Sequence, residues 1–287
     1  MRKSPLYALL LCLLADPALA EVPRVITDFG PVQSLVMDVM GDLGTATALL
    51  PKGGDPHDFQ LRPSQAQLLA HADLVFWIGP ELMPALADAL TNLTPQAQVT
   101  ALLHASGQTR AFADGGIDPH AWLDPVNGAA WLGTIAETLA ARDPTNAVTY
   151  RANATQAQTR LMQADTDWQT RLAPLRDRPF VTTHDALGYF ADHFGLTSAG
   201  AIALSDATPP SAARLNAVQS IMTQGRAVCI FPEAGRDPKF IATLTKGLAI
   251  RTGPAQDIEF TSLPAGRGQY LELLEQLVSG IETCLAN

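Results

Sequence analysis

The sequence is short of cysteine, of excess positive charge and of long apolar runs. Its three cysteines, Cys12, Cys229 and Cys284, are too few for a cysteine-rich scaffold or a thiolate zinc finger. The formal net charge is −9, which excludes the basic surface that nucleic-acid binding requires. No apolar run is long enough to span a bilayer, and no HExxH zinc-protease pattern occurs. We therefore expect no nucleic-acid partner and no membrane-spanning segment.

What the sequence has is enough apolar material for a sizeable core. Hydrophobic residues make up 47% of the 287 positions, which excludes wholesale disorder. The length suits two domains of ordinary size or one large α/β unit.

The first 20 residues have the pattern of a cleavable secretory signal. Two basic residues precede the apolar run 6–14, and residues 18–20 read Ala-Leu-Ala, a small-x-small cleavage pattern. The mature chain should therefore begin near Glu21. Leu11 precedes Cys12, where a lipoprotein would have a small residue, so we expect a soluble periplasmic protein.

The mature chain would keep two cysteines. Removal of the signal removes Cys12 and leaves Cys229 and Cys284, an even pair in an oxidising compartment. We expect a disulfide between them. Closing a loop of that length would stabilise the fold by at most roughly 4 kcal/mol on the chain-entropy account.

Strand and helix patterns alternate in two separate stretches, residues 22–93 and 178–285. Such alternation predicts parallel sheets covered by helices on both faces. We expect an α/β protein with an N-terminal lobe at 21–143 and a C-terminal lobe at 175–287.

A long helical segment without glycine separates the two stretches. Asp143 is a natural N-cap, Pro144 suits the first helical position, and the pattern continues to Leu172. A helix of that length would reach roughly 43 Å, so residues 144–174 would form a rigid link between lobes. The alternative is two shorter helices with a loop at 165–167.

Three of the six histidines occupy loops typical of ligand sites. His57 follows a predicted strand, His120 lies between Pro119 and Pro125, and His184 follows the strand pattern of residues 180–183. Ligands of α/β sheets bind beyond the carboxyl ends of strands. If the lobes face each other, the three imidazoles would converge on a metal in the cleft between them. We read the other histidines as structural or solvated: His71, His104 and His193.

The loops around these histidines resemble those of the metal-specific periplasmic binding proteins of ABC importers. The resemblance rests on residues 56–64 (PHDFQLRPS), 118–125 (DPHAWLDP) and 183–190 (THDALGYF), and residues 229–233 and 284–285 match the elements that form a disulfide in zinc-uptake members. It implies two α/β lobes joined by one long helix.

The resemblance also implies a ligand set and a metal. Asp257 matches the usual fourth ligand, an aspartate of the second lobe, and Glu233 is the runner-up, as an acceptor for a ligand histidine. Manganese-importing relatives have a glutamate where this chain has His184. Three imidazoles and one carboxylate favour Zn²⁺. The segment 105–118 lacks the histidine-rich loop of many zinc-uptake members.

The resulting hypothesis is high-affinity capture of Zn²⁺ in the periplasm and delivery to an inner-membrane ABC permease. Zn²⁺ is then the cargo, the protein is not an enzyme, and we expect a monomer, with a periplasmic metallochaperone as a further candidate partner. Three alternatives stay open: a manganese or other divalent-metal binder of the same family, a zinc-dependent hydrolase, and a surface adhesin of the same fold.

Overall fold

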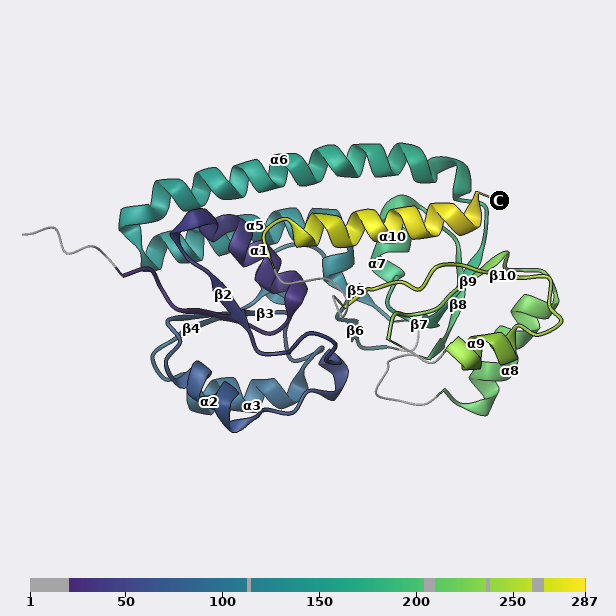
Figure 1. Cartoon of the computed structure of the whole chain (residues 1–287), viewed down its shortest axis with the longest axis horizontal. Helices are drawn as coiled ribbons and strands as arrows, with labels where there is room; N and C mark the ends of the chain where they lie inside the picture. The colour runs from purple at the N-terminus through teal and green to yellow at the C-terminus, as the bar shows by residue number, and fades with distance from the viewer. Residues whose placement is uncertain (1–20, 113–114, 204–209, 236–237, 260–265, 287) are drawn as a thin grey trace, which may run out of the picture.

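A computed structural model describes residues 21–112, 115–203, 210–235, 238–259 and 266–286. Two parallel sheets form the centres of two lobes, which lie side by side under one long helix (Figure 1). The expected α/β architecture is confirmed. The expected signal peptide at residues 1–20 lies outside the described residues.

The first lobe is built on a four-stranded parallel sheet with the order β2-β1-β3-β4. All four residues of β3 (Leu74–Trp77) are buried, as a strand covered on both faces requires. The other strands are β1 (Val25–Thr27), β2 (Ala46–Ala48) and β4 (Gln98–Ala101). The helices of this lobe are α1 (Gly30–Met40), α2 (Pro63–Ala70), α3 (Pro84–Leu93), α4 (Leu102–Ala105) and α5 (Pro125–Arg142).

The second lobe repeats this plan with the strand order β10-β9-β7-β8. Its central strands alternate between two faces: Phe180 and Phe231 belong to the large core, and Val181 and Ile230 to a smaller cluster. The strands are β7 (Phe180–His184), β8 (Ser198–Ala203), β9 (Cys229–Phe231) and β10 (Arg251–Thr252). The helices are α7 (Gly188–Phe194), α8 (Ala212–Thr223) and α9 (Pro238–Leu244).

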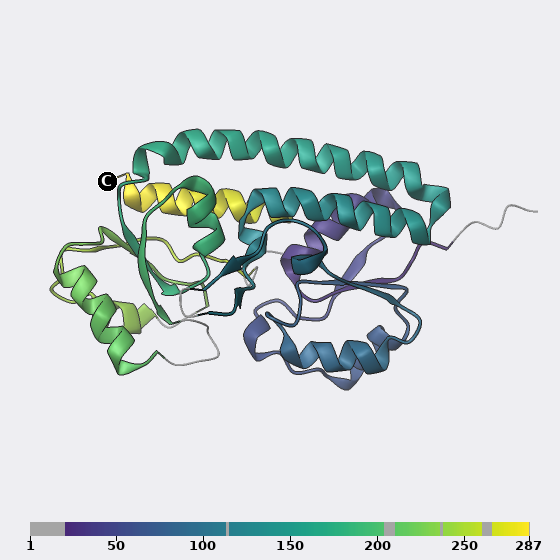
Figure 2. The same ribbon diagram turned by 180° about the vertical axis from the view of Figure 1, so that it is seen from behind.

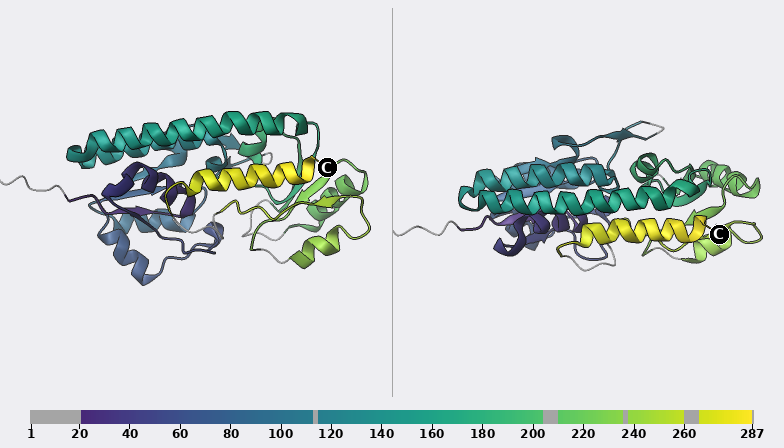
Figure 3. Two further views of the ribbon diagram at one scale, coloured as in Figure 1. Left: turned by 45° about the horizontal axis from the view of Figure 1, so that its top comes forward. Right: turned by 90° about the horizontal axis from the view of Figure 1, so that it is seen from above.

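Two helices run along both lobes. Helix α6 (Ala147–Leu172) is continuous over 26 residues, so the alternative of two shorter helices is wrong. A 3-10 turn at Pro144–Asn146 precedes it, and the Asp143 side chain caps that turn by accepting from the Asn146 amide. Helix α10 (Gln269–Leu285) lies beside α6 when the molecule is seen from above (Figure 3).

Helix α10 ties the lobes together a second time. At its start, the Tyr270 amide donates to Ser34 Oγ of α1 over 2.9 Å. Near its end, Cys284 forms the expected disulfide with Cys229 of β9. The main apolar cluster of buried residues therefore continues from the first lobe into the second. Within the described ranges, no helix has the length and apolar character needed to cross a membrane.

A small antiparallel hairpin lies where the lobes meet. Its strands are β5 (Arg110–Ala111) and β6 (Ile117–Asp118). The view from behind shows it between the first lobe and α7 (Figure 2). The hairpin leads directly into the loop of His120.

Candidate metal centre

His57 is presented by a single 3-10 turn, Pro56–Asp58, in the segment that follows β2. Pro56 stands at the start of the turn, and the Asp55 side chain accepts from the His57 amide over 2.8 Å. This capping fixes the backbone where the ring leaves the first lobe. The His57 side chain is only 8% exposed.

His120 lies between β6 and a 3-10 turn at Ala121–Leu123. Asp118 Oδ1 accepts both the His120 backbone amide, at 3.0 Å, and its Nδ1–H, at 2.7 Å. In the neutral ring this leaves the Nε2 lone pair to face a metal. The rings of His120 and Trp122 lie 5.1 Å apart, and both side chains are buried.

His184 is the last residue of β7 and extends from the carboxyl edge of the second sheet. Its Nδ1 lies 3.4 Å from Glu233 Oε2, and both side chains are nearly inaccessible. Glu233 follows β9 and pairs with Gln256 in an isolated parallel bridge. The pairing brings the chain after β10 alongside the residue that faces His184.

Glu259 comes from this same segment after β10. The backbone N–H of Gln256 donates to the Pro232 carbonyl, and the backbone carbonyl of Gln256 accepts from the Ala234 amide. These two bonds hold the segment alongside the residues that follow β9. The carbonyl of Ile258 accepts the indole N–H of Trp122 over 2.8 Å. Glu259 is thus held between the second lobe and the His120 loop, and it is 4% exposed.

These four side chains form one group. One ligand atom from each of His57, His120, His184 and Glu259 can be chosen so that all lie within 4.8 Å of one another. The ring centroids of the three histidines are 4.8–5.4 Å apart. His57 Nε2 lies 3.3 Å from Glu259 Oε1. With bonds of about 2.0–2.1 Å, two ligands of a tetrahedral zinc ion stand about 3.3 Å apart.

The predicted acids occupy different places. Glu233 lies against His184, where an acceptor was expected. Asp257 is not part of the four-residue group, and Glu259, two residues later, is. Both acids were visible in the sequence, but a turn at residues 258–259 decides which one faces the histidines. No residue pattern in the sequence gives the direction of that turn.

The other histidines lie outside the group. His71 ends α2, and its Nδ1 lies 2.8 Å from the Gln67 carbonyl oxygen. His104 belongs to α4 and contacts Glu81 at 2.8 Å. His193, in the last turn of α7, contacts Asp165 of α6 at 2.6 Å and Asp124 at 3.4 Å.

The group is buried, and the buried carboxylate of Asp118 supports it from outside. Burial raises the pKa of Asp118 to about 6, although the amide of His120 and the guanidinium of Arg110 lower it. Three imidazoles and one carboxylate carry a single negative charge when the rings are neutral, which suits a dication. Nitrogen-rich sets of four ligands favour Zn²⁺ over the harder Mn²⁺.

A family model described as "ZnuA: Zinc-uptake complex component A periplasmic" matches residues 25–284 of the chain. The chain belongs to this family. The resemblance seen in the histidine loops is thereby confirmed. The family is one of periplasmic zinc-uptake components, which agrees with zinc as the ion that this group of side chains would bind.

Curated relatives match along almost the whole length. A chain from Paracoccus denitrificans named high-affinity zinc uptake system protein ZnuA is 44% identical, with 94% of each chain covered. A protein of the same name from Brucella suis is 29% identical, over 93% of this chain and 92% of its own.

Solved structures share the fold. The periplasmic zinc-binding protein TroA from Treponema pallidum superposes with a TM-score of 0.84 at 22% identity, covering 92% of this chain and 99% of its own. A Cd-bound periplasmic metal-binding protein from Candidatus Liberibacter asiaticus gives a TM-score of 0.81 at 24% identity, with the same coverage. These likenesses confirm the fold of two α/β lobes.

Proposed function

We propose that this protein captures Zn²⁺ between its lobes and delivers it to an inner-membrane ABC permease. The observation that supports the proposal best is the convergence of His57, His120, His184 and Glu259. Two of these ligands come from each lobe. One ion would therefore hold both lobes in one arrangement, which a permease could recognise.

The burial of the ligands sets how the ion enters and leaves. The four side chains are 1–8% exposed, so a hydrated ion needs a local opening to reach them. The continuous helix α6 and the second crossing by α10 resist a wide hinge motion. We propose a small tilt of the lobes and a shift of the ligand loops. Affinity should fall at low pH, since protonated imidazoles cannot bind metal.

The ligand set favours transport over catalysis. A catalytic zinc keeps an open position for water or substrate, whereas Glu259 would close the fourth position here. We therefore propose a binding protein and not an enzyme. A manganese carrier is less well supported, because three nitrogen ligands suit Zn²⁺ better.

The remaining assignments stay part of the proposal. Residues 1–20 would be a cleaved signal, so that the mature protein begins near Glu21 in the periplasm. The segments 21–143, 144–174 and 175–287 would be the first lobe, the linking helix and the second lobe. We propose that the protein acts as a monomer and that a periplasmic metallochaperone is a further partner.

Calorimetric titration of the metal-free protein with Zn²⁺ tests the binding half. We expect one ion per chain, and strongly weakened binding in His57→Ala, His120→Ala and His184→Ala. His71→Ala is the control, because His71 lies at the end of α2. Equal affinity in all four variants would overturn the site. Uptake of labelled zinc by cells that carry each variant as their sole copy tests the delivery half.

A further inference from the structure

Arg110 connects the two lobes next to the metal centre. It is the first residue of the hairpin β5-β6, and its guanidinium has carboxylates on two sides. Nη1 donates to Asp118 Oδ2 over 2.9 Å, and Nε donates to Asp192 Oδ2 over 2.8 Å. Asp118 belongs to the same hairpin, whereas Asp192 lies on α7 of the second lobe.

On the side of the first lobe, the contact continues to a ligand. The two oxygens of Asp118 divide their roles: Oδ2 accepts from Arg110, and Oδ1 accepts from His120 Nδ1 at 2.7 Å. The Asp118 side chain is fully buried. Arg110 therefore compensates its charge and fixes the plane of the carboxylate, and that plane fixes the orientation of the His120 ring.

On the side of the second lobe, the guanidinium lies directly on α7. A Cβ added at Gly188 would collide with Arg110 Nη1, so the absence of a side chain there allows the approach. Tyr189, the next residue, accepts the Arg110 amide with its hydroxyl at 2.7 Å and donates to the Asp118 carbonyl at 3.0 Å. Helix α7 begins four residues after the ligand His184.

We propose that Arg110 is a positioning residue of the metal centre that makes the orientation of His120 depend on the docking of α7. The planar guanidinium reaches both carboxylates only while the hairpin lies against Gly188. If α7 moves away, the guanidinium loses Asp192, which holds it in the plane of the Asp118 carboxylate, and the orientation of the His120 ring is less firmly fixed. The inference rests on the proposed function, since it concerns the affinity of that same site.

Zn²⁺ affinity, measured by competition with a chromophoric chelator, gives the first test. Arg110→Gln should weaken binding about ten- to hundred-fold, the usual effect of removing the support of a ligand histidine. Arg110→Lys should lose less affinity than Arg110→Gln, because lysine keeps the positive charge beside Asp118. It should still bind more weakly than the unaltered protein, because lysine lacks the planar fork of the guanidinium. The control is Arg151→Gln. In the unaltered protein the Arg151 guanidinium pairs with Glu137 of α5, away from the metal centre. The Zn²⁺ affinity of this variant should equal that of the unaltered protein.

A double-mutant cycle gives the decisive test. Gly188→Ala should weaken binding in the unaltered protein, because its methyl group displaces the guanidinium. In the Arg110→Gln background the same substitution should have little further effect. An equal effect of Gly188→Ala in both backgrounds would overturn the proposal, as would unchanged affinity in Arg110→Gln.

A spectroscopic measurement separates positioning from general stability. The absorption of Co²⁺-saturated protein reports the geometry of the ligand atoms, and a loss of fold stability alone would not alter it at saturation. We expect Arg110→Gln and Gly188→Ala to change this spectrum, and Arg151→Gln to leave it unchanged. If the unaltered protein did not bind Zn²⁺, the proposed function would fail. If the unaltered protein bound Zn²⁺ through His120 but the spectra of all three variants matched its own, only the role of Arg110 would fail.

Discussion

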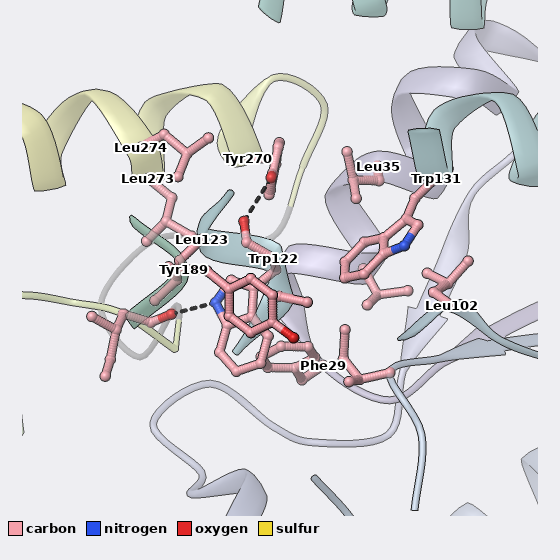
Figure 4. Packing of buried hydrophobic residues seen from close by; sticks show 14 of the residues in the cluster. Phe29, Leu35, Leu102, Trp122, Leu123, Trp131, Tyr189, Tyr270, Leu273 and Leu274 are labelled. Atoms are coloured by element: carbon pink, nitrogen blue, oxygen red, sulfur yellow. Dashed lines mark hydrogen bonds between the residues drawn. The ribbon is translucent and has the colours of Figure 1, made fainter. Parts of the chain in front are cut away.

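Trp122 donates its indole N–H to the carbonyl oxygen of Ile258 across 136 positions of sequence. One residue of this pair lies two positions after His120, and the other directly precedes Glu259. Tyr270 supports this contact, because its hydroxyl donates to the Trp122 carbonyl over 2.6 Å (Figure 4). Buried hydrogen bonds therefore hold together the loop of His120 from the first lobe and the segment of Glu259 from the second lobe.

We expect Glu259→Gln to weaken Zn²⁺ binding more than Asp257→Asn does. Glu259 lies in the four-residue group and Asp257 does not. Loss of a ligand should exceed the roughly ten- to hundred-fold loss that is typical when an outer partner is removed. Chelator competition on both variants provides the measurement. A larger loss in Asp257→Asn would restore Asp257 as the fourth ligand.

Much of the fold could be predicted because it depends on local pattern. The short apolar run at Leu74–Trp77 favours a buried strand, and the segment from Ala147 to Leu172 has no glycine or proline that would end a helix. Helix α5 (Pro125–Arg142) was missed, although its start was visible. Asp124 caps it by accepting from the Val126 amide at 2.8 Å, and Pro125 is its first residue. The sequence prediction used Pro125 only as one end of the segment that carries His120.

The three histidines of the group could be predicted for the same reason, since each lies within a short, recognisable sequence motif. The fourth member could not. Its place depends on the bridge between Glu233 and Gln256 and on the bond from Trp122 to Ile258. Both join segments that are far apart in the sequence. The role of Arg110 was likewise hidden, because Asp192 lies 82 positions away from it.

Removal of the disulfide should lower the free energy of unfolding without abolishing zinc binding. Cys229 and Cys284 are 55 residues apart and join β9 to α10. On the chain-entropy account, a loop of this length contributes about 4 kcal/mol, and we expect about 2–4 kcal/mol from Cys229→Ala/Cys284→Ala. Denaturant unfolding of the metal-free proteins measures the difference.

The control for the disulfide is the effect of reductant. Dithiothreitol should lower the stability of the unaltered protein under unfolding conditions and leave the double variant unchanged. The mature protein should also show no free thiol when it is denatured without reductant. Two titratable thiols per chain would contradict the prediction.

His193 should stabilise the metal-free fold more at low pH than at high pH. Burial lowers the pKa of His193. The hydrogen bond to Asp165 and the charges of Asp124 and Asp165 raise it by more than burial lowers it, so the net pKa lies above the ordinary 6.5. A raised pKa in the folded state means that the stabilisation is fully present below about pH 6.5 and is lost as the pH rises through the folded pKa.

The test compares His193→Gln with the unaltered protein in the presence of a chelator. We expect a loss of roughly 1.5 kcal/mol in the free energy of unfolding at pH 5.5, the size of a hydrogen bond to a charged group. The loss should be smaller at pH 9. His71→Gln is the control, since His71 is exposed at the end of α2. An equal loss from His193→Gln at both pH values would show that only packing is affected.

The last prediction concerns metal selectivity at His184. We expect His184→Glu to reduce the preference for Zn²⁺ over Mn²⁺, because a borderline nitrogen ligand is replaced by a hard carboxylate. The new carboxylate would stand beside Glu233, whose Oε2 lies 3.4 Å from His184 Nδ1. Repulsion between two neighbouring carboxylates raises their pKa values, so protons compete with the metal for them and metal binding weakens at lower pH.

The shift in selectivity should be partial. The Irving–Williams order favours Zn²⁺ over Mn²⁺ at most sites, and His57, His120 and Glu259 would still supply two nitrogens and an oxygen in a closed, buried group. We therefore expect weaker Zn²⁺ binding with a modest relative gain for Mn²⁺. Competition titrations of the two metals measure the ratio, and His71→Glu adds the same charge outside the site as a control. An unchanged Zn²⁺/Mn²⁺ ratio in His184→Glu would mean that His184 does not bind the ion.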